Sequence, residues 1–117
     1  MMIAHSLPDT FFGPAGSLHG ATYITDVSFY STTLNKYNVV IDIGLAQQLL
    51  SETLSSLQYK NLDELPQFKG KLTTTEFLAR YIHDELKEKT KDVFSGRIMV
   101  TLGESHIAWA SYEGETL

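Results

Sequence analysis

Alternating apolar and polar residues predict strands in the first part of the chain. Met1–His5 has an apolar pattern that fits the end of a strand, and Pro8–Ser17 is rich in residues that break regular structure. A long strand is predicted over Ala21–Tyr30, because alternate side chains there divide into two faces. The β-branched run Val39–Ile41 predicts a further short strand.

A second pair of alternating segments predicts a hairpin at the C-terminal end. The apolar residues of the first segment are Ile98, Val100 and Leu102, and one face of the second carries Ile107, Trp109 and Ser111. Gly103–Ser105 is expected to form the turn between them.

Two stretches between these strands have helical periodicity. In the first, which follows Asp42 and Gly44, leucines recur at helical spacing: Leu45, Leu49, Leu50, Leu54 and Leu57. The second begins with Thr73 and Glu76, which fit a capping box, and runs to about Lys89. His83 is expected on its exposed side.

Strands and helices are therefore segregated along the chain. This order predicts an α+β fold, in which two helices pack on one face of an antiparallel sheet. A chain of 117 residues has room for one hydrophobic core, so we expect a single domain over residues 1–117.

Composition narrows the chemistry. The chain has no cysteine, so thiolate metal sites, disulfides and a cysteine nucleophile are all excluded. The formal net charge is -5 with no basic cluster, which argues against nucleic-acid binding. The apolar runs are too short to span a bilayer, and Met1–Gly13 lacks the pattern of a signal peptide. We therefore expect a cytoplasmic protein.

Five short segments, in order, carry a resemblance to a known family: Ala4–Leu7, Leu18–Tyr23, Leu57–Asp63, Thr73–Glu76 and Gly103–Ser105. Together they resemble the 6-pyruvoyl-tetrahydropterin synthase / 6-carboxytetrahydropterin synthase family. The resemblance implies the tunnelling fold (T-fold), self-association into a trimer or hexamer that forms an oligomeric barrel, and a first strand that starts several residues earlier.

The resemblance also implies a metal site. The family pattern holds zinc with three histidines, and His5 and His19 match the first two positions. The third position is Ala21, which has no donor atom. Because two imidazoles rarely hold zinc firmly, we expect weak zinc binding at most. His106 is the substitute ligand to consider, since in an extended strand it would share a face with Glu104.

The positions that carry the family's chemistry are replaced. Ala15 stands where the resemblance places a cysteine base, and Gln58 and Tyr59 stand where it places an Asp–His pair. Of the three, only Tyr59 can ionise, and a phenol with a pKa near 10 is a poor base at neutral pH.

The positions that would recognise a pterin are kept. Glu104 matches the family glutamate that accepts two N–H groups from the ring, and Thr74 and Thr75 match its pocket wall. We therefore predict a protein that binds a pterin or a purine-like ring without the standard lyase activity. Two alternatives are a lyase-like enzyme with altered acid and base residues, and a structural or interaction subunit.

Overall fold

A computed structural model describes residues 1–116 and confirms the α+β class with antiparallel sheets. The strands are β1 (Met2–His5), β2 (His19–Thr22), β3 (Ile24–Tyr30), β4 (Arg97–Ser105) and β5 (Ala108–Glu115). The helices are α1 (Ile43–Ser55) and α2 (Thr75–Thr90), with short 3-10 turns η1 (Thr10–Gly16), η2 (Leu62–Glu64) and η3 (Pro66–Phe68).

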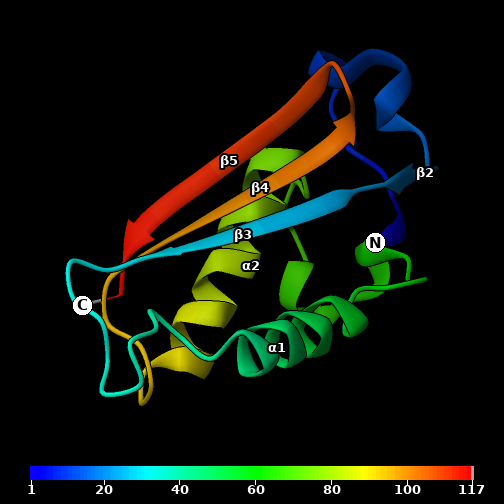
Figure 1. The fold of residues 1–117 in the computed structure, drawn as a ribbon. Helices are drawn as coiled ribbons and strands as arrows, with labels where there is room; N and C mark the ends of the chain where they lie inside the picture. The colour runs from blue at the N-terminus through cyan, green and yellow to red at the C-terminus, as the bar shows by residue number, and fades with distance from the viewer. Residues whose placement is uncertain (117) are drawn as a thin grey trace.

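The strands form two sheets rather than one. β1 pairs with β2, and β3, β4 and β5 form a separate three-stranded sheet with β4 in the centre. Figure 1 shows α1 and α2 on the same face of the three-stranded sheet, with the small β1–β2 ladder at one end. No described helix is long and apolar enough to cross a membrane.

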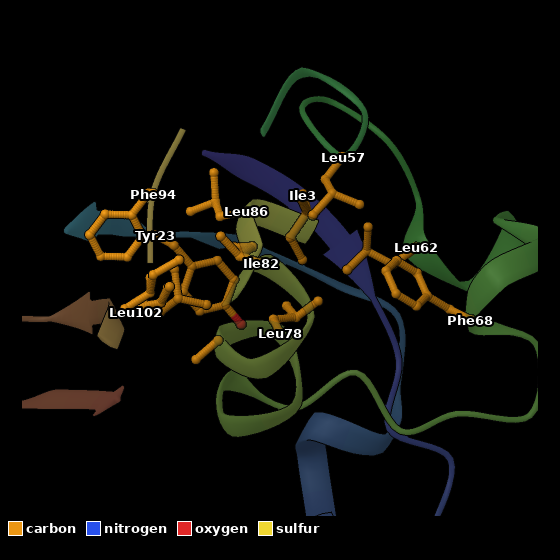
Figure 2. Close-up of a cluster of buried hydrophobic side chains, with 13 residues drawn as sticks. Ile3, Tyr23, Leu57, Leu62, Phe68, Leu78, Ile82, Leu86, Phe94 and Leu102 are labelled. Carbon is orange, nitrogen blue, oxygen red and sulfur yellow. The ribbon is translucent and has the colours of Figure 1, made fainter. Parts of the chain in front are cut away.

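The hydrophobic core fills the space between α2 and the sheet (Figure 2). The even-numbered residues of β4 from Ile98 to Leu102 are fully buried there, which matches the predicted apolar face. They pack with Leu78, Ile82 and Leu86 of α2, which are also fully buried. These residues share one face of α2, as helical spacing requires. The core thus fixes α2 along the sheet.

The predicted long strand over Ala21–Tyr30 is broken at Tyr23. The backbone N–H of Tyr23 donates to the carbonyl of Met1 at 2.7 Å, which continues the β1–β2 ladder. The next residue, Ile24, pairs with Gly103 of β4 instead. The chain therefore changes partner strand at Tyr23, and alternation along the sequence does not reveal such a change.

The predicted strand over Val39–Ile41 is wrong. The side chain of Asn35 accepts hydrogen bonds from the N–H groups of Tyr37 and Val39, at 2.9 and 3.3 Å. Asn38 has a φ of 63°, which closes a tight turn. Asparagine turn chemistry therefore outweighs the strand preference of the β-branched residues here.

The start of α2 also differs from the prediction. Its N-cap is Thr74, whose hydroxyl accepts from the N–H of Phe77 at 3.1 Å, and the helix begins at Thr75. Thr73 and Glu76 therefore do not form the predicted capping box. The hydroxyl of Thr73 is bonded to His5 instead.

Candidate ring-binding site

The two histidines of the first motifs meet across the β1–β2 ladder. His5 pairs directly with His19, so both side chains lie on the same face. Their ring centroids are 4.7 Å apart at an angle of 65°. The structure therefore brings together the two residues that the resemblance assigns to a metal site.

Each of these histidines is held through Nδ1. Nδ1 of His5 lies 3.0 Å from the hydroxyl of Thr73, and Nδ1–H of His19 donates to the carbonyl of Ser17 at 2.8 Å. His5 is only 2% exposed. Burial, and next the positive charge of His19, lower the pKa of His5, although Thr73, Asp63 and Glu104 oppose the shift. The neutral imidazole is therefore the favoured form of His5.

Glu104 lies in β4 rather than in the turn where it was predicted. Gly103 pairs with Trp109 and Ser105 pairs with Ala108, so Glu104 is the extra residue of a β-bulge. The turn is formed by His106 and Ile107. β-Bulges often re-aim a side chain next to a functional site, and this one leaves Glu104 exposed at the end of the sheet.

Glu104 and Tyr23 lie at the same end of the β3–β4 ladder. Ile24, the residue after Tyr23, pairs with Gly103, the residue before Glu104. The charge of Glu104 influences both neighbouring side chains, because it raises the pKa of Tyr23 and of His5. The site therefore gathers residues from β1, from the junction between β2 and β3, and from β4.

Tyr23 is a part of the site that the sequence analysis treated only as a strand residue. It is 2% exposed, and burial is the main cause that raises its pKa. Its hydroxyl has no hydrogen-bond partner within 3.5 Å among residues 1–116, and neither has the hydroxyl of Thr25, although the Thr75 side chain is near enough to act on the pKa of Tyr23 as a hydrogen-bonding group. Leaving a buried hydroxyl unpaired costs about 1–3 kcal/mol. The quoted motif that ends in Tyr23 was the available signal, but the sequence alone does not show this burial.

The three threonines before α2 have different surroundings. Thr73 is buried against His5, and Thr74 accepts the capping bond described above. Thr75 is half-buried and lies near Tyr23, whose pKa is lowered somewhat by it. Of the two predicted pocket threonines, Thr75 is therefore the one without a capping role, while one acceptor site of the Thr74 hydroxyl is occupied by the capping bond.

Comparison with known proteins decides the family. The 6-pyruvoyl tetrahydropterin synthase family matches residues 1–115. The chain belongs to this family. A 6-pyruvoyl tetrahydrobiopterin synthase from Dictyostelium discoideum is 29% identical over 106 residues, which are 89% of this chain and 76% of the relative.

Solved structures of the family have the same fold. A 6-pyruvoyl tetrahydropterin synthase from Caenorhabditis elegans superposes with a TM-score of 0.82 at 23% identity, covering 97% of this chain and 89% of the other. The Plasmodium vivax protein of the same name has a TM-score of 0.79 at 17% identity, covering 98% and 91%. A variant of the Plasmodium vivax protein changed at a catalytic glutamate is also similar, with a TM-score of 0.78.

The three histidines that the resemblance implies as zinc ligands are only partly present. Ala21 pairs with Ile3, two residues along the ladder from His5 and His19, and therefore lies on their face of the ladder. Within residues 1–116 no group of three potential ligands could hold a metal ion. The residues present therefore do not fit a three-histidine zinc centre, and zinc affinity stays a prediction.

His106 does not extend this site in the way the sequence suggested. The bulge at Glu104 and the turn at His106 end the extended strand, so the expected shared face is not formed. The remaining histidine, His83, is buried at 2% exposure and not on the surface as predicted. Its Nδ1 lies 3.0 Å from a carboxylate oxygen of Asp84, and its Nε2 lies 3.2 Å from the carbonyl of Gly114.

Two of the replaced positions, Gln58 and Tyr59, lie against the start of β1 rather than against His5 at its end. The amide oxygen of Gln58 accepts from the N–H of Met2 at 2.9 Å, and the N–H of Tyr59 donates to the carbonyl of Met2 at 2.7 Å. His5 is three residues further along β1, about 10 Å away at the rise of a strand. Tyr59 is 77% exposed. It therefore faces solvent rather than the site at the start of α2.

Ala15 occupies the third replaced position, within η1. Its carbonyl accepts a hydrogen bond from the N–H of Leu7 at 3.1 Å, which holds η1 against the end of the Ala4–Leu7 segment. A methyl side chain supplies neither a proton acceptor nor a nucleophile, so this position contributes no acid or base.

Proposed function

We propose that this member of the 6-pyruvoyl tetrahydropterin synthase family binds a pterin or guanine-type ring and does not perform the standard lyase reaction. The observation that carries the proposal is the contrast between the two halves of the family's site. His5 is bonded to Thr73 just before α2, Thr75 begins α2 and the charge of Glu104 acts on His5, whereas Ala15, Gln58 and Tyr59 occupy the positions that the resemblance assigns to the base and acid.

The chemistry of Glu104 supports ring binding. A carboxylate accepts two parallel N–H bonds, which matches the edge of a ring that carries an amide N–H beside an amino group. Because Glu104 is exposed on a bulge outside the core, a ring can replace the water around its carboxylate without a rearrangement of the core. The rings that present this edge are pterins and guanine, so these are the ligands to test.

Calorimetric titration of neopterin, biopterin and guanine derivatives tests the proposal directly. Wild type should bind at least one of them, and Glu104→Gln should bind about ten- to a hundredfold more weakly, because one charged acceptor is lost. Thr75→Val should weaken binding less. Glu115→Gln, an exposed carboxylate at the other end of β5, is the matched control and should bind as wild type does.

The outcome also distinguishes a binding protein from a structural subunit. If no such ring binds at millimolar concentration, or if Glu104→Gln binds as well as wild type, the protein is a structural subunit and the ring-binding proposal is wrong. A general acid or base typically contributes about 10²- to 10⁴-fold to a rate. We therefore expect no meaningful turnover of dihydroneopterin triphosphate by the purified protein.

An enzyme with altered chemistry is the second candidate. Tyr59 has a φ of 61°, a conformation that costs a non-glycine residue free energy and that occurs at functional positions. Robust turnover of dihydroneopterin triphosphate that Tyr59→Phe abolishes would establish this candidate in place of ours.

The exposed sheet edges support self-association. Within residues 1–116, β3 and β5 each pair only with β4, so each leaves one edge unpaired. Pairing such edges between copies removes the hazard of open strands. We expect a homo-oligomer, a trimer or a hexamer, by light scattering. A stable mass of 13.1 kDa across concentrations would contradict this.

A further inference from the structure

An apolar groove lies between β3 and α1, on the side of β3 that faces away from β4 (Figure 1). It holds a cavity of about 330 Å³, with a lining that is mostly aliphatic or aromatic: Val27, Phe29, Val40, Ile41, Ala46 and Leu50. A second cavity of about 390 Å³ shares Leu50 with the first and extends to Met1. The groove therefore continues along α1 toward the N-terminus, and it has room for a row of side chains.

The wall that β3 contributes to this groove is an open strand edge. β4 pairs with β3 from Ile24 to Tyr30 on one side. On the other side β1 reaches only as far as Tyr23, whose N–H and carbonyl are both bonded to Met1, at 2.7 and 2.8 Å. The β1–β2 ladder therefore stops where the open edge of β3 begins.

The backbone groups along this edge point into the groove. Hydrogen-bonding directions alternate along an antiparallel strand. Because Tyr23 bonds toward the β1 side, the N–H and C=O groups of Thr25, Val27 and Phe29 point to that side as well. Within residues 1–116 no segment other than β4 bonds to the backbone of β3.

The outer edge of β1 is treated differently, because the chain covers it. The N–H of Ala4 donates to the carbonyl of Lys60 at 3.0 Å, and the carbonyl of Met2 accepts from the N–H of Tyr59 at 2.7 Å. An apolar molecule would fill the groove beside β3 and leave that strand's backbone unsatisfied. An added peptide strand satisfies both, because its backbone pairs with the edge and alternate side chains enter the groove.

The outer face of β3 adds a preference for charge. Asp26 points away from the groove and is exposed, and the ion pairs of the described residues do not include it. Opposite charges on neighbouring strands stabilise a sheet, and like charges destabilise it. In β5, Glu113 and Glu115 lie on the same face as Asp26, so β5 of a second copy is a poor partner for this edge. A strand with lysines on its outer face is a better one.

We propose that the groove between β3 and α1 binds an extended segment of another polypeptide as an added antiparallel strand. The segment matches the seven residues of Ile24–Tyr30. Its apolar side chains, at every second position, lie on Val27, Phe29 and Leu50, and its outward side chains are polar or basic beside Asp26. The edge of β5 stays available for self-association. This interaction does not depend on ring binding.

The test is a titration of a fluorescent peptide, Lys-Val-Thr-Val-Lys-Val-Thr-Val-Lys with capped ends, followed by anisotropy. The matched control peptide has the same side chains but N-methyl groups on its valines, which are the residues whose N–H groups face β3. We expect saturable binding of the first peptide by wild type. The methylated peptide should bind about tenfold more weakly or worse, because several backbone hydrogen bonds are lost.

Two variants locate the binding on the protein. Ala46→Phe fills the groove from α1 and should weaken peptide binding about tenfold or more without lowering the melting temperature. Gln48→Phe adds the same ring on the exposed side of α1 and should bind the peptide as wild type does. Asp26→Lys should weaken binding of this lysine-containing peptide by a smaller factor.

Three results would overturn the inference. Absence of peptide binding at millimolar concentration means that the edge accepts no strand. Equal binding of the methylated peptide means that the groove takes apolar groups without strand pairing. If light scattering shows that the peptide binds only as it dissociates an oligomer, a second copy occupies the edge. Neopterin titration of the same samples keeps the proposed function separate, since either interaction can fail while the other is observed.

Discussion

The two ends of the layer between α2 and the sheet differ in how completely their buried polar groups are hydrogen-bonded. Toward the C-terminal end of β5, both ring nitrogens of His83 lie within hydrogen-bond distance of oxygens of the chain itself. At the other end, the hydroxyls of Tyr23 and Thr25 are unpaired within residues 1–116. His5 and His19 are each held there through one nitrogen.

This difference suggests that one end of the domain serves stability and the other end serves binding. Folded proteins satisfy buried polar groups wherever stability is the only requirement, and departures from this rule concentrate at sites that bind something. The His83 end should therefore respond to mutation through stability alone, and the Tyr23 end mainly through binding.

The largest expected effect comes from completing the histidine pair. Ala21→His adds a third imidazole on the face of the ladder that already carries His5 and His19. A four-ligand zinc site is worth about 10–16 kcal/mol, so one added ligand should raise zinc affinity by several hundredfold. Competition against a chelator, followed by metal analysis after dialysis, measures this gain.

The control for this substitution is Ala108→His, which adds an exposed histidine at the start of β5 and should gain no zinc. Wild type should lose its zinc in dialysis or hold it at partial occupancy. Stoichiometric zinc in dialysed wild type would mean that a third ligand exists, and His106 would be the first residue to substitute.

A somewhat smaller effect is expected at the structural end. His83 packs on Gly114, where an added Cβ would lie 3.1 Å from two ring atoms. His83→Ala removes a buried ring and two hydrogen bonds, and should cost about 2–3 kcal/mol in the free energy of unfolding. Urea unfolding gives this value, and the exposed His106→Ala is the control. Ring binding by His83→Ala, measured below its melting temperature, should equal that of wild type.

Much of the fold could be predicted from the sequence, for identifiable reasons. The alternation in Ile98–Leu102 reports burial directly, and the structure agrees with it, whereas the leucines Leu49, Leu50 and Leu54 of α1 are only partly buried against the core. Glu104 was found through its motif. The strand over Val39–Ile41 was predicted wrongly, because the turn depends on the Asn35 side chain and not on local strand preference.

The features that could not be predicted depend on contacts between distant segments. Tyr23 was missed because the chain leaves the β1 ladder there and joins β4 at the next residue, close to the bulge that carries Glu104. His83 was assigned to the surface because the side of α2 that carries it has no continuous apolar pattern. Only the packing of β5 over that side buries it.

The smallest expected effect is a pH dependence that originates at the Tyr23 end. The pKa of His5 is lowered in the folded protein, first by burial and next by the charge of His19. Above a pH of about 6.5 the imidazole is neutral in both states, and its full contribution to stability is present. As the pH falls below that value, the unfolded chain takes up a proton more readily than the folded one, so the free energy of unfolding decreases.

Melting temperatures between pH 8 and pH 5, measured with a chelator present, test this contribution. We expect wild type to lose stability below pH 6.5 and His5→Gln to lose less, because glutamine can still bond to Thr73 but cannot take up a proton. The matched control is His106→Gln, in the exposed turn, whose curve should follow that of wild type. If His5→Gln and wild type have parallel curves, His5 is not the source of the pH dependence. The folded protein would then accept a proton at the His5–His19 pair without losing stability, and the polar groups at this end would be better satisfied than the comparison with His83 implies.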